Sequence, residues 1–169
     1  MQNINTEIQE KTGIFCVSTK VESFPMWAHY ADNAKGVAIE FENLEEAFAG
    51  NSSRVLDKLR PISYYKDQRP SVTLRPSDLS ELFFSKYIDW EYEQEYRVVK
   101  VLSDCEPVKC SDGKKRYYYT IKEPQKYIKR IIVGWKCSND CIAIIKKTWP
   151  NIKVTQARVN DFGNIEIKD

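Results

Sequence analysis

The chain has 169 residues, 42% hydrophobic and 30% charged, a composition typical of a folded globular protein and not of a disordered or membrane-spanning one. Its net charge of +2 predicts no general attraction to nucleic acid or anionic lipid. It has no basic N-terminal region followed by an apolar run, and no apolar stretch of membrane-spanning length, so we expect a cytoplasmic protein without a membrane partner. Residues 1–12 are polar and lack a period, which predicts a flexible or weakly helical lead-in, and the length of the chain predicts a single domain over residues 13–169.

Apolar patterning and turn residues divide the rest of the chain into short elements. Apolar runs bounded by Gly, Asn, Asp and Pro predict strands, and apolar residues three or four positions apart predict helices. Ser23 is placed to cap the first helix, and Pro25 suits its first turn. In chain order, we expect a strand over 13–19, a helix over 26–32, a strand over 36–41, helices over 43–50 and 54–60, a strand over 62–65, a helix over 77–87, strands over 93–102, 108–110, 116–121 and 130–134, a helix over 140–148, and strands over 152–157 and 165–167.

The order of these elements predicts an α+β fold. Residues 111–113 form the expected turn of a hairpin, and residues 130–157 read as a strand, a helix and a second strand. Together they favour a curved sheet, mixed or mainly antiparallel, flanked by short helices.

The stretch from Trp90 to Arg97, WEYEQEYR, places three carboxylates, an arginine and three aromatic rings in eight residues. On a strand, alternation puts Glu93, Glu95 and Arg97 on one face. A solvated edge strand would also explain this pattern. We expect Arg97 to pair with Glu93, Glu95 or Asp32 and to keep that carboxylate ionised.

The cysteines do not predict a metal site. Their odd number, five, in a chain without an export signal indicates reduced thiols. The pairs Cys105 with Cys110 and Cys137 with Cys141 have only loose zinc-ligand spacing, and the sole histidine, His29, is near neither pair. We therefore expect no metal.

Two stretches resemble the signature of a large uncharacterised bacterial domain family. The first is residues 26–32, MWAHYAD, followed by Lys35, Gly36 and Val37; the second is residues 86–97, KYIDWEYEQEYR. The resemblance covers about residues 13–160, and the chain looks like a member with a shortened N-terminal portion. The family has no settled function, although some members are expected among bacterial defence genes.

A more distant resemblance concerns the order of motifs. Residues 15–19 (FCVST), a helix, residues 36–41 (GVAIEF), and later Glu93-Gln94-Glu95 entering a strand are similar to ADP-ribosyltransferases. In those enzymes, a carboxylate stabilises the oxocarbenium-like centre formed when nicotinamide leaves the ribose of NAD. The resemblance implies an ADP-ribosyltransferase-like fold with NAD as the substrate. It implies that Glu95 is the catalytic glutamate and that Glu93 activates the acceptor. It also implies that Ser18 and Thr19 support the nicotinamide pocket, that Trp27, His29 or Tyr30 supplies the ring that stacks on the nicotinamide, and that Arg97 is a further cofactor-binding residue.

The chain departs from that pattern in two places. Lys20 follows Thr19, so the third hydroxyl of the serine-threonine-serine motif is absent, and residues 1–12 contain no arginine or histidine to hold NAD. Ordinary structural roles also fit: a hydrogen-bonded helix pair for His29 and Tyr30, and core anchoring for Trp27.

Two classes of function therefore stay open. The first is an NAD-dependent ADP-ribosyltransferase or NAD glycohydrolase, acting on a macromolecular acceptor or on water. The second is a catalytically silent binding module that acts through a protein partner, in either case linked to bacterial or phage defence. The run at residues 114–119, KKRYYY, resembles a nucleic-acid surface, but the alternating faces of a hairpin arm explain it more simply. The acceptor and the oligomeric state are not determined by the sequence.

Overall fold

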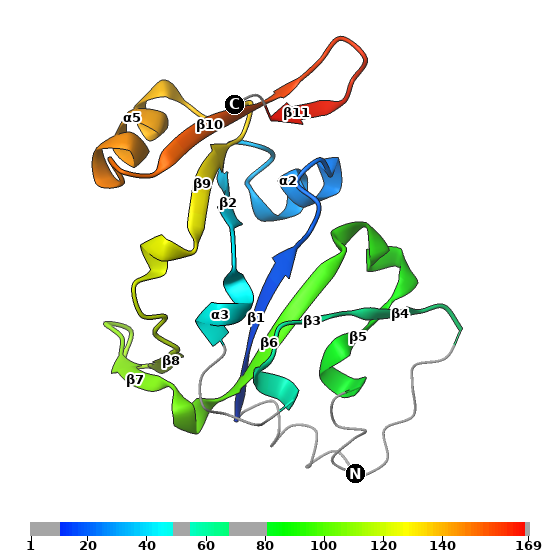
Figure 1. Ribbon diagram of the computed structural model, residues 1–169, viewed down its shortest axis with the longest axis vertical. Coiled ribbons are helices and arrows are strands. Elements are labelled where there is room, and N and C mark those ends of the chain that lie inside the picture. Colours follow the sequence, from blue (N-terminus) through cyan, green and yellow to red (C-terminus); the bar gives the residue numbers. More distant parts are fainter. Residues whose placement is uncertain (1–10, 49–54, 68–80, 168–169) are drawn as a thin grey trace. The chain divides into compact units, whose positions relative to one another are not determined.

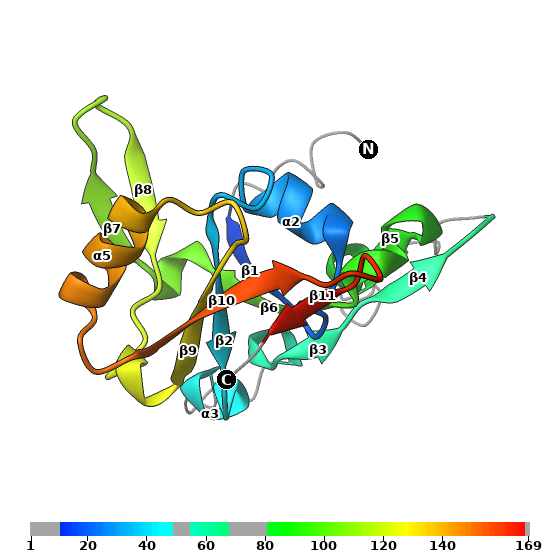
Figure 2. The same cartoon turned by 90° about the horizontal axis from the view of Figure 1, so that it is seen from above.

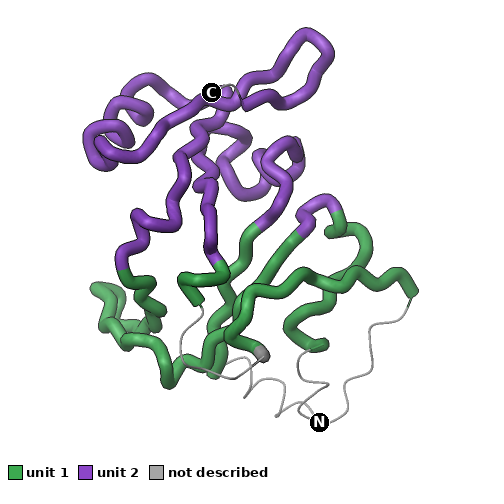
Figure 3. Tube along the Cα trace, viewed as in Figure 1, with its two compact units in different colours: residues 1–17, 45–91, 95–122 green, residues 18–44, 92–94, 123–169 purple. Residues whose placement is uncertain are grey.

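The computed structural model describes residues 11–48, 55–67 and 81–167 of the chain (Figure 1). The chain divides into two compact units, coloured separately in Figure 3. The first unit comprises residues 1–17, 45–91 and 95–122; the second comprises residues 18–44, 92–94 and 123–169. The predicted lead-in lies outside the described residues up to residue 10, and the prediction of one domain over residues 13–169 stays a prediction.

The elements confirm the α+β class. The helices are α2 (Phe24–Tyr30), α3 (Leu44–Phe48) and α5 (Asn139–Thr148), with 3-10 turns η1 (Val55–Asp57), η2 (Ile88–Glu93), η3 (Leu102–Asp104) and η4 (Pro124–Lys126). The strands are β1 (Thr12–Ser18), β2 (Val37–Phe41), β3 (Arg60–Pro61), β4 (Ser63–Tyr65), β5 (Ser85–Tyr87), β6 (Glu95–Val101), β7 (Glu106–Lys109), β8 (Lys115–Tyr118), β9 (Ile128–Val133), β10 (Lys153–Val159) and β11 (Ile165–Ile167).

The first unit is built on a three-stranded sheet with the order β1-β6-β3. β3 runs antiparallel to β6, β4 and β5 form a parallel pair, and β7 and β8 form the predicted antiparallel hairpin. Its core is an apolar cluster on these strands and the turn before β5: Ile62, Phe83, Phe84 and Val99. A buried ion pair joins Lys100 Nζ to Asp57 Oδ1 at 3.4 Å in the same unit.

The second unit holds a mixed four-stranded sheet with the order β11-β10-β9-β2 (Figures 1 and 2). β9 and β10 are parallel and joined through α5, as the sequence predicts, while β2 and β11 are antiparallel to their neighbours. Ser138 caps α5, accepting a hydrogen bond from the Cys141 amide at 3.2 Å. α2 packs on this sheet through a cluster of buried residues: Trp27, Ala31, Ala34, Ile132, Ala157 and Ile165.

Gly134 ends β9 at a point where the backbone comes very close to another segment. A Cβ added there would lie 2.1 Å from the Ala34 carbonyl oxygen. Only glycine allows this contact, which places the segment after α2 against the end of the sheet.

Two predicted elements differ from the structure. The helix expected to continue to Tyr87 stops at Phe84, and Ser85–Tyr87 is strand β5; the predicted start at residues 77–80 lies outside the described residues. Pairing with β4 competes successfully with helix propensity here, and Ser85 Oγ donates to the Glu81 carbonyl at 2.6 Å. The helix expected over residues 54–60 is reduced to the turn Val55–Asp57 in the described part.

The acidic strand also begins later than predicted. Glu93 ends the 3-10 turn η2, and Gln94 has a φ of 42°, in the left-handed region. The strand starts only at Glu95, so Glu93 does not share a strand face with Glu95 and Arg97. Among the described residues, no helix has both the length and the apolarity needed to cross a membrane.

Candidate functional site

Of the predicted site residues, Glu95 and Arg97 lie in the first unit and the others lie in the second. We call the first-unit set of Cys16, Lys86, Glu95 and Arg97 the Glu95 group. We call the second-unit set of Ser18, Thr19, His29, Tyr30 and Glu93 the Tyr30 group. Each is described by itself.

The Glu95 group is centred on a two-pronged ion pair along β6. Arg97 Nε donates to Glu95 Oε1 at 2.6 Å, and Arg97 Nη2 donates to Oε2 at 3.0 Å. The two residues are neighbours on one face of the strand, as alternation predicts. The third arm of the guanidinium, Nη1, donates to the Phe83 carbonyl at 2.7 Å. The predicted pairing of Arg97 with a carboxylate is therefore confirmed, and of the three candidates, Glu93, Glu95 and Asp32, the partner is Glu95.

Residues of β4 and β5, which form a separate two-stranded sheet, and Ile62 hold Glu95 as well. Lys86 on β5 donates from Nζ to Glu95 Oε2 at 3.1 Å. The Glu95 amide donates to the Tyr64 hydroxyl oxygen at 2.9 Å, and the Glu95 carbonyl accepts from the Ile62 amide at 2.9 Å. The side chain and the backbone of Glu95 are thus both held from neighbouring strands.

These partners keep Glu95 charged although it is only 6% exposed. Burial by itself raises its pKa, but hydrogen bonds from Arg97, Cys16 and Lys86, with the positive charge of Arg97, outweigh burial and hold the pKa below the ordinary value of 4.5. Burial lowers the pKa of Arg97, and Glu95 more than reverses this effect. The group is therefore a carboxylate with two cations at neutral pH.

The thiol of Cys16 lies against the same ion pair. Although the residue as a whole is exposed, burial around its sulfur raises the pKa to about 12, and a hydrogen bond to Glu95 and the Glu95 charge add to the effect. Such a thiol stays protonated at neutral pH, which excludes it as a thiolate nucleophile.

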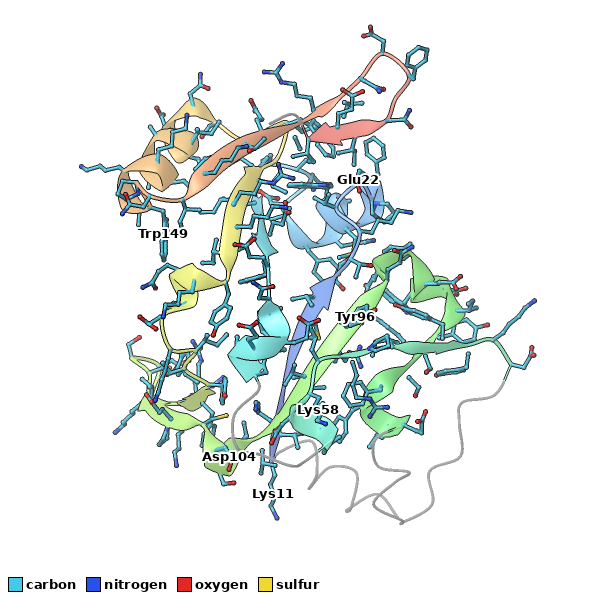
Figure 4. All side chains as sticks on the ribbon, in the orientation of Figure 1. Lys11, Glu22, Lys58, Tyr96, Asp104 and Trp149 are labelled. Carbon is cyan, nitrogen blue, oxygen red and sulfur yellow. The ribbon has the colours of Figure 1, made fainter. Side chains whose placement is uncertain are left out.

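An aromatic surface adjoins Lys86. Its Nζ lies 4.8 Å from the centroid of the Trp90 ring, which is 41% exposed. The sequence analysis did not single out Lys86 as a site residue. The available signal was its spacing of four residues from Trp90 within the motif. In Figure 4, Tyr96 is labelled on β6, where it separates Glu95 from Arg97 in the chain.

The Tyr30 group joins segments far apart in the sequence. Ser18 Oγ donates to the Glu93 carbonyl at 2.5 Å, across 75 positions, and Tyr30 Oη donates to Glu93 Oε1 at 2.8 Å, across 63 positions. Thr19 donates through its amide to the Gln94 carbonyl at 3.2 Å. Glu93 is 3% exposed, whereas Tyr30 is 63% exposed, so a buried carboxylate orients an exposed ring.

His29 and Trp27 have different surroundings in the same unit. His29 is exposed, and its ring centroid lies 6.5 Å from those of Tyr30 and Tyr92. Trp27 is 3% exposed and donates from Nε1 to the Val21 carbonyl at 2.8 Å. Trp27 therefore anchors α2 in the core, and His29 and Tyr30 present the accessible rings of that helix.

Within the described part of the chain, no three His, Cys, Asp or Glu side chains lie close enough together to hold a metal ion.

Part of the chain is similar to a known family of proteins. Residues 26–98 match the model of a family described as Protein of unknown function (DUF2971). The matched segment begins at the MWAHYAD stretch and ends one residue after Arg97. No curated protein matches the chain, and no solved structure does. The similarity thus relates this segment to an uncharacterised family and supplies no activity.

Proposed function

We propose that the chain is an NAD-dependent ADP-ribosyltransferase or NAD glycohydrolase in which Glu95 is the catalytic carboxylate. The observation that carries the proposal is the ionised, nearly buried Glu95 at the start of β6, held by Arg97 and Lys86. The distant resemblance assigns the catalytic glutamate to this same position. An arginine that takes one carboxylate edge fixes its orientation at no further cost during the reaction.

The chemistry needs a fixed negative charge beside the ribose. The bond between the nicotinamide nitrogen and ribose C1 breaks, nicotinamide leaves with the bonding electrons, and positive charge develops on the ribose. An ionised Glu95 stabilises that charge and accepts a hydrogen bond from a ribose hydroxyl. The acceptor, a macromolecular nucleophile or water, then bonds to C1 and loses its proton.

Lys86 gives this scheme a way to free the carboxylate. Its Nζ contacts both Glu95 Oε2 and the Trp90 ring, and its side chain is 19% exposed. In the proposal, the diphosphate of NAD attracts the Lys86 ammonium, and the ribose hydroxyl takes the place of Lys86 on Oε2, while Arg97 keeps its hydrogen bonds to Oε1 and Oε2. Trp90, with its exposed ring, is the stacking surface for a base of the dinucleotide.

Nicotinamide release from NAD by the purified protein, with and without cell lysate as a source of acceptors, tests the proposal. Glu95→Gln should abolish release. Glu40→Gln is the matched control and should leave release unchanged. Glu40 also pairs with one lysine and one arginine, Lys129 at 2.6 Å and Arg130 at 2.5 Å, but these residues lie on β2 and β9 of the second unit. Release that survives Glu95→Gln, or no release by the native chain, would refute the catalytic role.

Binding provides a second measurement that does not depend on turnover. NAD or a non-reacting analogue should raise the melting temperature of Glu95→Gln as well as of the native protein, because Lys86 and Trp90 remain. Lys86→Met should remove that rise. An unchanged melting temperature in all three proteins would argue against an NAD site.

A second candidate, a catalytically silent binding module, is favoured by the Tyr30 group. Tyr30 is 63% exposed, yet its hydroxyl is fixed by the buried Glu93, and exposed His29 lies next to it. A rigid, accessible tyrosine is the kind of residue that contributes strongly to protein interfaces. Tyr30→Ala should then abolish retention of a protein partner, whereas Tyr118→Ala, on another exposed ring in the first unit, should not. Equal retention by both variants would contradict this candidate.

A further inference from the structure

Two cysteines that belong to neither the Glu95 group nor the Tyr30 group lie where β9 passes into α5. Cys137, 8% exposed, lies in the turn after Val133, and its amide donates to the Gly134 carbonyl at 3.0 Å. Cys141 is half-buried in the first turn of α5, where its amide donates to Ser138 Oγ at 3.2 Å. The cap and the turn fix both backbones, so the spacing of the two thiols is set by the fold.

The two thiols face the same apolar layer. Both belong to the cluster that packs α5 on β9 and β10. Burial raises the pKa of Cys137, and a hydrogen bond between its side chain and that of Cys141 adds to this effect. Two thiols within hydrogen-bond reach on adjoining turns are close to the geometry that a disulfide needs.

We propose that Cys137 and Cys141 form a dithiol that closes reversibly to an intramolecular disulfide by exchange with a low-molecular-weight disulfide such as glutathione disulfide. The pair is a modification site independent of Glu95 and of the Tyr30 group. The other three cysteines have different surroundings. Cys16 contacts Glu95, Cys105 Sγ donates to the Val101 carbonyl at 3.7 Å, and Cys110 lies in the turn between β7 and β8, where its amide donates to the Lys114 carbonyl at 2.9 Å.

Accessibility sets the order of the two steps. Cys141 is the more exposed thiol, so the small disulfide reaches it before the buried Cys137. Its thiolate attacks one sulfur of the small disulfide, forms a mixed disulfide and releases one small thiolate. Cys137 then loses its proton and attacks the Cys141 sulfur, releasing the second small thiolate. The two protein sulfurs are oxidised, and the small disulfide is reduced to two thiols.

Thiol counting in glutathione buffers of increasing oxidising strength tests this proposal. The native chain should fall from five alkylatable cysteines to three in one step, and peptide mapping should place the new bond between residues 137 and 141. Reduction should restore all five thiols. Retention of five thiols at the most oxidising buffer, or a bond between other cysteines, would overturn the proposal.

Single variants separate the two roles. Cys137→Ala should stop at a stable glutathione adduct on Cys141, and Cys141→Ala should form no disulfide at residue 137. Cys105→Ala, the control, should lose two thiols as the native chain does. The number of free thiols in the native chain already decides whether the disulfide forms. The proposal can therefore be tested even if one of the variants does not fold. An adduct that forms first on Cys137 would contradict the proposed order.

Discussion

Replacing Arg97 with methionine should destabilise the protein strongly, because it removes the main partner of a nearly buried charge. The change leaves Glu95, 6% exposed, with Lys86 as its remaining cationic partner, and it leaves the Phe83 carbonyl without its 2.7 Å donor. Breaking a buried ion pair by removing one partner costs about 3–5 kcal/mol. Because Lys86 still neutralises part of the charge, we expect a loss near the lower end, about 3 kcal/mol, in the free energy of unfolding.

Urea unfolding at pH 7, followed by tryptophan fluorescence, measures this loss. Arg130→Met is the matched control: Arg130 pairs with Glu40, whose side chain is 27% exposed, so its removal should cost only about 1 kcal/mol. The double variant Glu95→Gln with Arg97→Met should lose less than the sum of the single changes, since each removes the same interaction. Equal, small losses for Arg97→Met and Arg130→Met would refute the reasoning.

The same pair predicts a pH dependence. The pKa of Glu95 in the folded protein lies below the ordinary value of 4.5, so the unfolded chain takes up this proton first as the pH falls. The stabilisation is therefore complete above about pH 4.5 and is lost as the pH falls through the lower, folded pKa. The difference in unfolding free energy between the native protein and Arg97→Met should shrink over that range. A difference that stays constant down to pH 3 would contradict this prediction.

Two further predictions concern a close backbone contact and a protected thiol. Gly134→Ala should prevent folding or lower the free energy of unfolding by more than about 3 kcal/mol, because the added Cβ would lie 2.1 Å from the Ala34 carbonyl oxygen. Gly113→Ala is the control: Gly113 has a φ of 78° but lies in open space, so this change should cost only about 1 kcal/mol. Thermal melts of the two variants measure the difference. Cys16, with a pKa of about 12, should alkylate slowly at pH 8, and Glu95→Gln should speed the reaction by removing two contributions that raise this pKa. An unchanged rate by mass spectrometry would show that Glu95 does not protect the thiol.

Local signals account for the elements that the sequence predicted well. The hairpin of β7 and β8 follows from the Ser111-Asp112-Gly113 turn, where Gly113 has a positive φ. The parallel pairing of β9 and β10 through α5 follows from an apolar run, a capped helix and a second apolar run. In these cases the residues that decide the structure are neighbours in the chain.

The failures occurred where distant segments compete with local preference. Residues 85–87 have helical spacing, but pairing with β4 makes them a strand. Glu93 has the alternation of a strand residue, but the left-handed Gln94 separates it from β6 and leaves it with Tyr30 and Ser18. Neither partner is visible from the local pattern.

The sequence by itself determined the α+β class and most of the strands and helices. It also determined that Glu95 and Arg97 share a strand face, because residues two positions apart on a strand point the same way whatever surrounds them. Only the tertiary structure decided that Lys86 completes this pair and that Ser18 and Tyr30 meet Glu93. Those contacts join segments up to 75 positions apart, so they exist only after strand pairing and core packing have brought the segments together.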